Sequence, residues 1–339
     1  MVQYLIQNLL NILRPHVKPK NPNHAVLEAE YVAWIDDSPY LNDEHKKAWK
    51  RAELPLLMSR AFPEAELGPL RVSLDFMMLF LMLEQLTDAP ATPADARKWA
   101  DIYIQAYKQT LEETKGLASL VKELASRVVN AVEEPYRSHL IASNVTLAEG
   151  TVKEASDRES PSHGLSLEAY MDARRDSVGI QPFFDLQRWI SKLDIPQDVL
   201  KHPGVMILEE YAINMGAIAN DLYSYKKEFF ESGAHHNFVA VAMRDPSANV
   251  PPGDRQKAIT HTCKQFTKYL EDFHRQKKEL PSFGRDVDKM VEQYSNALLD
   301  IVAGSILWSL VCRRYGHLDP STESNAPTWG EVVFEMDPL

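Results

Sequence analysis

Residues 204–230 read GVMILEEYAINMGAIANDLYSYKKEFF, and this stretch decides how the rest of the chain is interpreted. It contains few helix breakers, so it predicts one long helix. Its first half, from Met206 to Ala219, is apolar and rich in small residues. Such a composition is typical of a helix that lines the interior of an all-α protein. The second half, from Asn220 onward, is more polar.

Three oxygen-bearing side chains follow one another at helical spacing in the second half. Asn220, Ser224 and Glu228 are each four residues apart, which places an amide, a hydroxyl and a carboxylate on one helix face. Such hard oxygen donors suit Mg²⁺, and no sulfur or imidazole lies at a ligand spacing that would favour zinc. The alternative is an ordinary solvated face, because this spacing arises by chance in roughly one chain in ten.

Composition and charge exclude several classes of protein. The 339 residues carry a formal net charge of −11, so nonspecific binding to nucleic acid is disfavoured because phosphates are repelled. Two cysteines, Cys263 and Cys312, are too few for a disulfide framework and fit a reducing, cytoplasmic compartment. The chain lacks a run of about 18 apolar residues, so no stable membrane insertion is expected.

Other segments also favour helices. Only 13 glycines occur, and β-branched residues seldom run together. Long helices are expected over residues 71–87, 95–131, 183–193, 204–230 and 284–315. Breaks between them are expected at residues 88–90, 148–166 and 244–254, where proline, glycine, serine or charged residues gather. The predicted fold class is all-α, with a single helical domain over residues 1–316 and a polar C-terminal tail over residues 317–339.

The segment from Asn220 to Glu228 resembles the second metal motif of microbial class I terpene synthases. In that motif Asp follows the Asn and Lys precedes the Glu, and Asp221 and Lys227 fill these two places. The other metal motif of the family ends an apolar helix in the first third of the chain. Glu84-Gln-Leu-Thr-Asp88 stands there, with Glu where the family usually has Asp and Gln where an acidic residue or Asn is usual.

Two further segments strengthen the resemblance. The family has a diphosphate-sensing arginine about 46 residues before the Asn of the motif, with a glycine four residues beyond the arginine. Arg174 satisfies the 46-residue spacing, whereas Arg175 lies four residues before Gly179, and this second criterion favours Arg175. Near the C-terminus, Arg314-Tyr315 resembles the family's Arg-Tyr pair, which hydrogen-bonds the diphosphate.

The resemblance implies a class I terpenoid synthase bundle around a deep apolar cavity, with the two metal motifs at its mouth. Three Mg²⁺ ions would be held by Glu84, Asp88, Asn220, Ser224 and Glu228. The substrate diphosphate would contact Arg175 or Arg174, Lys227, Arg314 and Tyr315. The cavity lining would include the backbone carbonyl of Gly179 and the rings of Phe76, Phe80, Phe183, Phe184 and Trp308, although each aromatic residue also fits an ordinary core.

Size and layout are most similar to the fungal sesquiterpene synthases, which implies farnesyl diphosphate as substrate and leaves geranyl diphosphate open. The altered Glu84-Gln85 motif suggests the hypothesis of early quenching to an acyclic alcohol such as nerolidol or linalool. Two alternatives remain. A trans-prenyltransferase would normally show two motifs with paired aspartates, and a catalytically inactive helical scaffold would explain the altered motif. A monomer and a homodimer are both compatible with the sequence.

Overall fold

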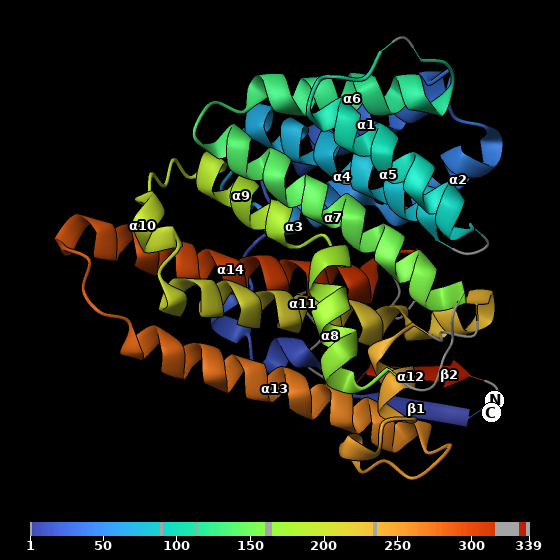
Figure 1. The fold of residues 1–339 in the computed structure, drawn as a ribbon, viewed down its shortest axis with the longest axis vertical. Helices are drawn as coiled ribbons and strands as arrows, with labels where there is room; N and C mark the ends of the chain where they lie inside the picture. Colours follow the sequence, from blue (N-terminus) through green and yellow to red (C-terminus); the bar gives the residue numbers. More distant parts are fainter. Residues whose placement is uncertain are drawn as a thin grey trace. The chain divides into compact units, whose positions relative to one another are not determined.

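The computed structural model describes residues 2–88, 91–112, 114–159, 165–232, 236–315 and 332–336. The chain forms two compact units (Figure 1). The first unit comprises residues 1–18, 161–175 and 194–339, and the second comprises residues 19–160 and 176–193. The prediction of one domain over residues 1–316 stays a prediction.

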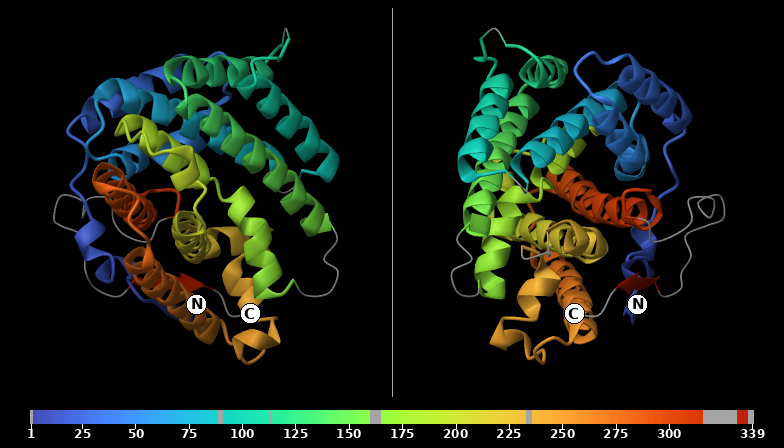
Figure 2. Two further views of the ribbon diagram at one scale, coloured as in Figure 1. Left: turned by 60° about the vertical axis from the view of Figure 1, so that its left-hand side comes forward. Right: turned by 90° about the vertical axis from the view of Figure 1, so that its right-hand side faces the viewer.

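The described residues of the second unit form helices and connecting loops. Its helices are α1 (His24–Asp37), α2 (Asp43–Ala52), α3 (Leu54–Ala61), α4 (Leu67–Thr87), α5 (Pro93–Tyr107), α6 (Leu117–Ala131), α7 (Tyr136–Glu159) and α9 (Gln181–Ile190). Helix α4 packs against α5 and α6, and α5 lies beside α7 (Figures 1 and 2). The apolar run from Phe76 to Leu83 is almost entirely buried, which explains why this part of α4 needs so few polar residues.

The first unit combines helices with a small antiparallel sheet. Its elements are β1 (Val2–Ile6), the 3-10 helices η1 (Leu9–Asn11), η2 (Arg14–His16) and η3 (Pro246–Ala248), α10 (Gln197–Leu200), α11 (Pro203–Ser232), α12 (Phe238–Ala242), α13 (Arg255–Glu279), α14 (Arg285–Val311) and β2 (Val332–Met336). Helix α8 (Leu167–Ser177) begins in this unit and ends just inside the second. Helix α11 packs between α13 and α14 (Figure 1).

Four of the five long helices predicted from sequence are present. They are α4, α9, α11 and α14, with boundaries within a few residues of those expected. The break after α4 is also confirmed, because α4 ends at Thr87 and α5 begins at Pro93. The Thr92 side chain caps α5 by accepting the N–H of Asp95, and the Asp95 carboxylate accepts the backbone N–H of Thr92. The expected start of the next helix is therefore a capping box.

The prediction of one helix over residues 95–131 is wrong. Helix α5 ends at Tyr107 and α6 begins at Leu117. Gln109 takes a left-handed backbone conformation with a φ of 55°, and its neighbour Thr110 donates its N–H to the carbonyl of Gln105. These contacts close the end of α5. The apolar residues of α5 and of α6 both follow helical spacing, so the sequence pattern did not indicate the break between the two helices.

The loop predicted over residues 148–166 is wrong as far as Glu159, because α7 continues to that residue. Gly150 is one of the residues on which the loop prediction rested, but it lies inside α7, where the absence of a side chain lets another segment pack closely against the helix. A Cβ atom at Gly150 would lie 2.7 Å from the backbone carbon of Asp176. Residues 160–164 lie outside the described part of the chain.

The polar tail predicted over residues 317–339 contains a strand that the sequence analysis did not anticipate. Val332 to Met336 forms β2, which pairs with β1 in the register Tyr4 to Phe334. Val332 is buried. The other residues of this tail, 317–331 and 337–339, lie outside the described part of the chain.

By length and composition alone, α14 is apolar enough to cross a membrane. However, 83% of its most apolar window is buried inside the protein. A largely buried core helix passes the same test. The apolar composition of α14 is therefore explained by its burial inside the protein.

A buried carboxylate on α4 makes stability depend on pH. Burial raises the pKa of Asp75 to about 6, although Arg127 lies 3.5 Å from it. The folded state then holds this proton more tightly than the unfolded chain, so stability falls as pH rises from about 4 to 6 and is level above that. We expect Asp75→Asn to remove this fall, which amounts to about 3 kcal/mol.

Urea unfolding of the wild type and Asp75→Asn between pH 4 and 7 tests this expectation. Asp286→Asn is the matched control, because the Asp286 side chain is 90% exposed. Equal pH dependence in the wild type and Asp75→Asn would contradict the assignment.

Candidate functional site

The three oxygen donors predicted on one helix face lie on α11 in the first unit. Ser224 is buried, while Asn220 and Glu228 are half-buried. The hydroxyl of Ser224 donates to Oε1 of Glu228 over 2.5 Å. The side chains at the second and third positions are thus in direct contact, as the four-residue spacing predicts.

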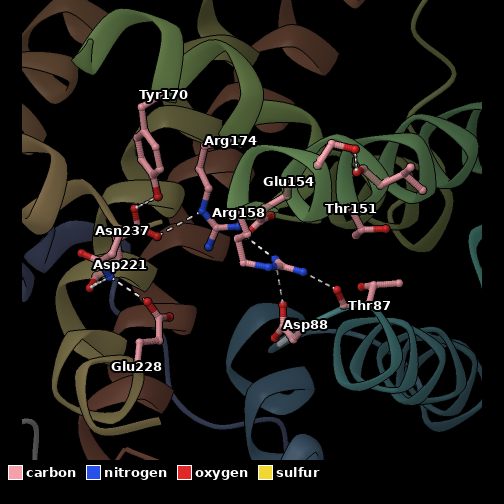
Figure 3. Close-up of polar contacts among 12 residues, drawn as sticks. Thr87, Asp88, Thr151, Glu154, Arg158, Tyr170, Arg174, Asp221, Glu228 and Asn237 are labelled. Carbon is pink, nitrogen blue, oxygen red and sulfur yellow. Dashed lines mark hydrogen bonds and ion pairs between the residues drawn. The ribbon is translucent and has the colours of Figure 1, made fainter. Parts of the chain in front are cut away.

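Asp221, the residue after Asn220, points into the protein and collects hydrogen bonds from two other helices. Its carboxylate accepts from the hydroxyl of Tyr170 at 2.5 Å and from Nε of Arg174 at 3.1 Å, both on α8 (Figure 3). It also accepts from the backbone N–H of Phe238 at 2.9 Å, at the start of α12. Asp221 is only 1% exposed. The carboxylate therefore ties α8 and α12 to α11.

The structure distinguishes the two candidate arginines on α8 by their contacts. Nη2 of Arg174 donates to Oδ1 of Asn220 over 2.8 Å. Arg175 instead donates to Oδ1 of Asn214, which lies six residues earlier on α11, and forms ion pairs with Asp172 and with Glu210. Geometry thus brings Arg174 to the motif, whereas the glycine criterion favoured Arg175.

One member of the C-terminal pair, Tyr315, contacts the motif. The hydroxyl of Tyr315 accepts a hydrogen bond from Nδ2 of Asn220 over 3.3 Å. The Tyr315 ring packs edge-on against Trp308, with ring centroids 5.4 Å apart, and the guanidinium of Arg314 lies 5.9 Å from the Tyr315 ring centre. Lys227 is half-buried on α11, directly before Glu228. Asn220 is thus contacted from both α8 and the end of α14.

Glu228 is held by a residue that the motif does not include. Nδ2 of Asn237 donates to Oε2 of Glu228 at 2.9 Å (Figure 3). Burial, and then the negative charge of Asp221, raise the pKa of the Glu228 carboxyl. A divalent cation beside Glu228 would offset the repulsion between these two carboxylates, and the amide, hydroxyl and carboxylate oxygens suit Mg²⁺. The site therefore fits a magnesium ion.

A cluster of three or more His, Cys, Asp or Glu side chains that could hold a metal is not found among the described residues. The motif on α11 is not a cluster of this kind, because two of its three donors are Asn and Ser. Mixed oxygen donors are compatible with Mg²⁺, which usually keeps several waters and shares the phosphates of a substrate.

The other predicted metal segment lies at the end of α4 in the second unit. Glu84 is half-buried, and Asp88 is the exposed residue that ends the helix, with its N–H bonded to the carbonyl of Glu84. Oε1 of Gln85 accepts a hydrogen bond from the indole of Trp49 at 2.9 Å. Gln85 therefore has a structural partner at the position where the family usually has an acidic residue.

Arg158 on α7 contacts the same end of α4. Its guanidinium donates to the carbonyl of Thr87, and it lies 3.7 Å from Asp88 and 3.8 Å from Glu154 (Figure 3). The sequence analysis missed Arg158 because it falls in the segment expected to be a loop. Its cationic group lies beside one of the two predicted carboxylate ligands of this segment.

Aromatic residues of the second unit gather around Gly179. Phe76 lies 6.5 Å from Phe80 and 5.4 Å from Phe183 between ring centroids. Gly179 has a φ of +73°, and a Cβ atom there would lie 2.5 Å from the Phe80 ring, so only glycine fits. Phe80 is half-buried, while Phe76 and Phe184 are fully buried. Phe80 is therefore the most exposed of these three rings.

Sequence reasoning missed the residues that support the motif. Tyr170 and Asn237 carry no spacing signal relative to Asn220, because they lie on other elements. Trp49 was missed for the same reason. Such supporting hydrogen-bond donors can be identified only from the tertiary structure, in which the elements that carry them are in contact.

The chain is also similar to known proteins. Residues 75–272 match the family model described as "Terpene synthase family 2, C-terminal metal binding". The chain is 27% identical over 301 residues to a Delta(6)-protoilludene synthase of Armillaria gallica, covering 87% of this chain and 84% of the relative. It is 26% identical to Sesquiterpene synthase 1 of Postia placenta, covering 83% and 81%.

A solved structure shows the same fold. The crystal structure of a-eudesmol synthase superposes with a TM-score of 0.73 at 18% sequence identity. The match covers 86% of this chain and 96% of that protein. The all-α fold class predicted from sequence is confirmed, with the two-stranded sheet as an addition.

Proposed function

Because this chain belongs to terpene synthase family 2, we propose that it is a magnesium-dependent sesquiterpene synthase that ionises farnesyl diphosphate. As a class I terpene synthase it is a lyase that acts on a prenyl diphosphate and uses a divalent metal. The C15 substrate is supported by the names of its relatives, among them sesquiterpene synthases of Postia placenta.

One observation carries the proposal: the donors of Asn220, Ser224 and Glu228 on one face of α11, with Arg174 beside them. These three residues would hold Mg²⁺, and Glu84 and Asp88 on α4 would hold the remainder of the three ions expected for the family. When bound, the ions withdraw charge from the diphosphate leaving group, so that the allylic C–O bond breaks.

The protein's own residues bind and orient the diphosphate. The guanidinium of Arg174 is held at Nε by Asp221 and at Nη2 by Asn220, which places a planar group of phosphate-binding donors beside the proposed metal ligands. Arg175 is the alternative to Arg174 in this role. Lys227, Arg314 and the hydroxyl of Tyr315 would complete the neutralisation. Tyr315 is already in contact with Asn220, which places a second donor next to the proposed metal ligand.

The allylic cation needs a lining that attracts it without reacting with it. Aromatic faces provide such a lining, at about 2 kcal/mol each in a desolvated site. Phe80 and Trp308 are candidates for this lining. Phe76, whose ring packs against Phe80, and Phe183, whose ring packs against Phe76, are further candidates. The carbonyl of Gly179, in its left-handed backbone conformation, would face the substrate.

The product is proposed to be an acyclic alcohol such as nerolidol, or linalool if geranyl diphosphate is used. The support is the departure of Glu84 and Gln85 from the usual acidic motif, which weakens control over the metal at that end. Cys263 and Cys312 are buried and form no disulfide with each other, which supports a reducing compartment, and we place the enzyme in the cytoplasm as a monomer or homodimer.

Incubation of the purified protein with farnesyl and geranyl diphosphate tests the reaction class. We expect a volatile terpene when Mg²⁺ is present, and a loss of at least about 100-fold with excess chelator. Gas chromatography with mass spectrometry identifies the product. The control is recovery of activity when Mg²⁺ is added back.

The same experiment separates the alternatives. Mainly polycyclic hydrocarbon as product would contradict the acyclic alcohol but leave the synthase intact. Longer prenyl diphosphates would indicate a prenyltransferase. A folded protein that releases no diphosphate from either substrate would indicate an inactive scaffold.

A further inference from the structure

Asn237 is a fully buried asparagine in the first unit, directly before α12. Its Oδ1 accepts the backbone N–H of Val239 at 2.9 Å, so it caps this helix. Its Nδ2 donates to the backbone carbonyl of Asp221 at 2.8 Å and to Oε2 of Glu228 at 2.9 Å. One amide thus joins the start of α12 to two points on α11.

The hydrogen bonds to Glu228 divide between its two carboxylate oxygens. Ser224 donates to Oε1, and Asn237 donates to Oε2. A glutamate side chain has three rotatable bonds, and ordering it costs conformational entropy. Two donors from different elements restrict these rotations before any ligand arrives, which reduces the free-energy cost of binding.

The chemical nature of the donor is important. Asn237 is neutral, so it orients the carboxylate without supplying a positive charge. A lysine or arginine at this place would compensate Glu228 and compete with a cation for it. The neutral amide adds no positive charge beside Glu228, and a second buried carboxylate, Asp221, lies on the same helix.

We propose that Asn237 is a positioning residue for the metal site, which it serves by holding the Glu228 carboxylate in the orientation that binds a divalent cation together with diphosphate. This inference rests on the proposed function of the α11 motif. It adds a residue outside that motif, on an element that follows α11 in the chain.

Substitution by serine separates positioning from helix capping. Serine caps a helix about as well as asparagine, so Asn237→Ser keeps an oxygen for the N–H of Val239. Its side chain is too short to replace both donors of the amide. Asn42 provides a matched control, since it caps α2 through the N–H of His45 and lies on the exposed surface. Asn42→Ser makes the same chemical change at a cap that is remote in sequence from the motif.

The experiment measures Mn²⁺ binding in the presence of inorganic diphosphate, by the electron paramagnetic resonance signal of free Mn²⁺. We expect Asn237→Ser to raise the dissociation constant at least tenfold, and Asn42→Ser to leave it within twofold of the wild type. In a Glu228→Gln background, Asn237→Ser should have no further effect, because its role is exerted through that carboxylate. Should Asn237→Ser fail to fold, Asn237→Thr fills more of the volume and takes its place.

Outcomes for the inference and for the proposed function are distinguishable. Unchanged Mn²⁺ affinity in Asn237→Ser, or an equal loss in the wild-type and Glu228→Gln backgrounds, would overturn the positioning role. The proposed function would fail separately if the wild type bound no Mn²⁺ with diphosphate present, or if Asn220→Ala bound it as tightly as the wild type.

Discussion

Asn220→Ala is expected to lower kcat/KM for farnesyl diphosphate by at least about a thousandfold, equivalent to about 4 kcal/mol of transition-state stabilisation. The substitution removes an oxygen ligand of the proposed metal. It also removes the acceptor of Arg174 and the donor to Tyr315. Asn220 thus connects the metal to two groups that would bind the diphosphate, so its loss affects all three.

Steady-state release of diphosphate measures this effect, and circular dichroism verifies the fold. Asn130→Ala is the matched control, because Asn130 is exposed near the end of α6 and accepts a hydrogen bond from Gln109, which is also exposed. We expect it to retain the activity of the wild type within twofold. Activity of Asn220→Ala within tenfold of the wild type would exclude Asn220 as a metal ligand.

Asp221→Ala is expected to lower the free energy of unfolding by about 3–5 kcal/mol, the range found when one partner of a buried ion pair is removed. The carboxylate is 1% exposed and accepts hydrogen bonds from Tyr170, Arg174 and Phe238. Without it, the buried hydroxyl and the partly buried guanidinium lose their acceptor. Helices α8 and α12 lose a shared attachment to α11.

Urea unfolding at pH 7 measures the change. Asp101→Ala is the control, because Asp101 forms an exposed ion pair with Arg97 at 3.3 Å, and such pairs contribute about 0–1 kcal/mol. A loss below about 1 kcal/mol for Asp221→Ala would show that water replaces the carboxylate without cost, contrary to its buried position.

Most helices near the proposed site could be predicted because each depends on local sequence. The long apolar stretches of α4, α11 and α14 specify helices through their periodicity, and Thr92 and Pro93 mark where α5 begins. The secondary-structure prediction failed where a residue type is compatible with two different structural roles. Gly150 suggested a loop, but it serves close packing against Asp176, which no local pattern can reveal.

The sequence by itself determined the family, the residue types of the proposed metal ligands, and the four-residue spacing between those ligands on α11. These are local properties, because residues four apart on a helix share a face whatever surrounds it. It could not choose between Arg174 and Arg175, since a spacing rule does not specify which side chain turns toward a neighbouring helix.

Only the tertiary structure decided the contacts made between elements. It brought Arg174 to Asn220 and Asp221, Tyr315 to Asn220, and Asn237 to Glu228. Each of these pairs joins different helices or a helix and a loop, separated by 9 to 95 residues in the chain. Their geometry depends on how the helices pack, and packing is set by the whole set of buried side chains rather than by any one segment.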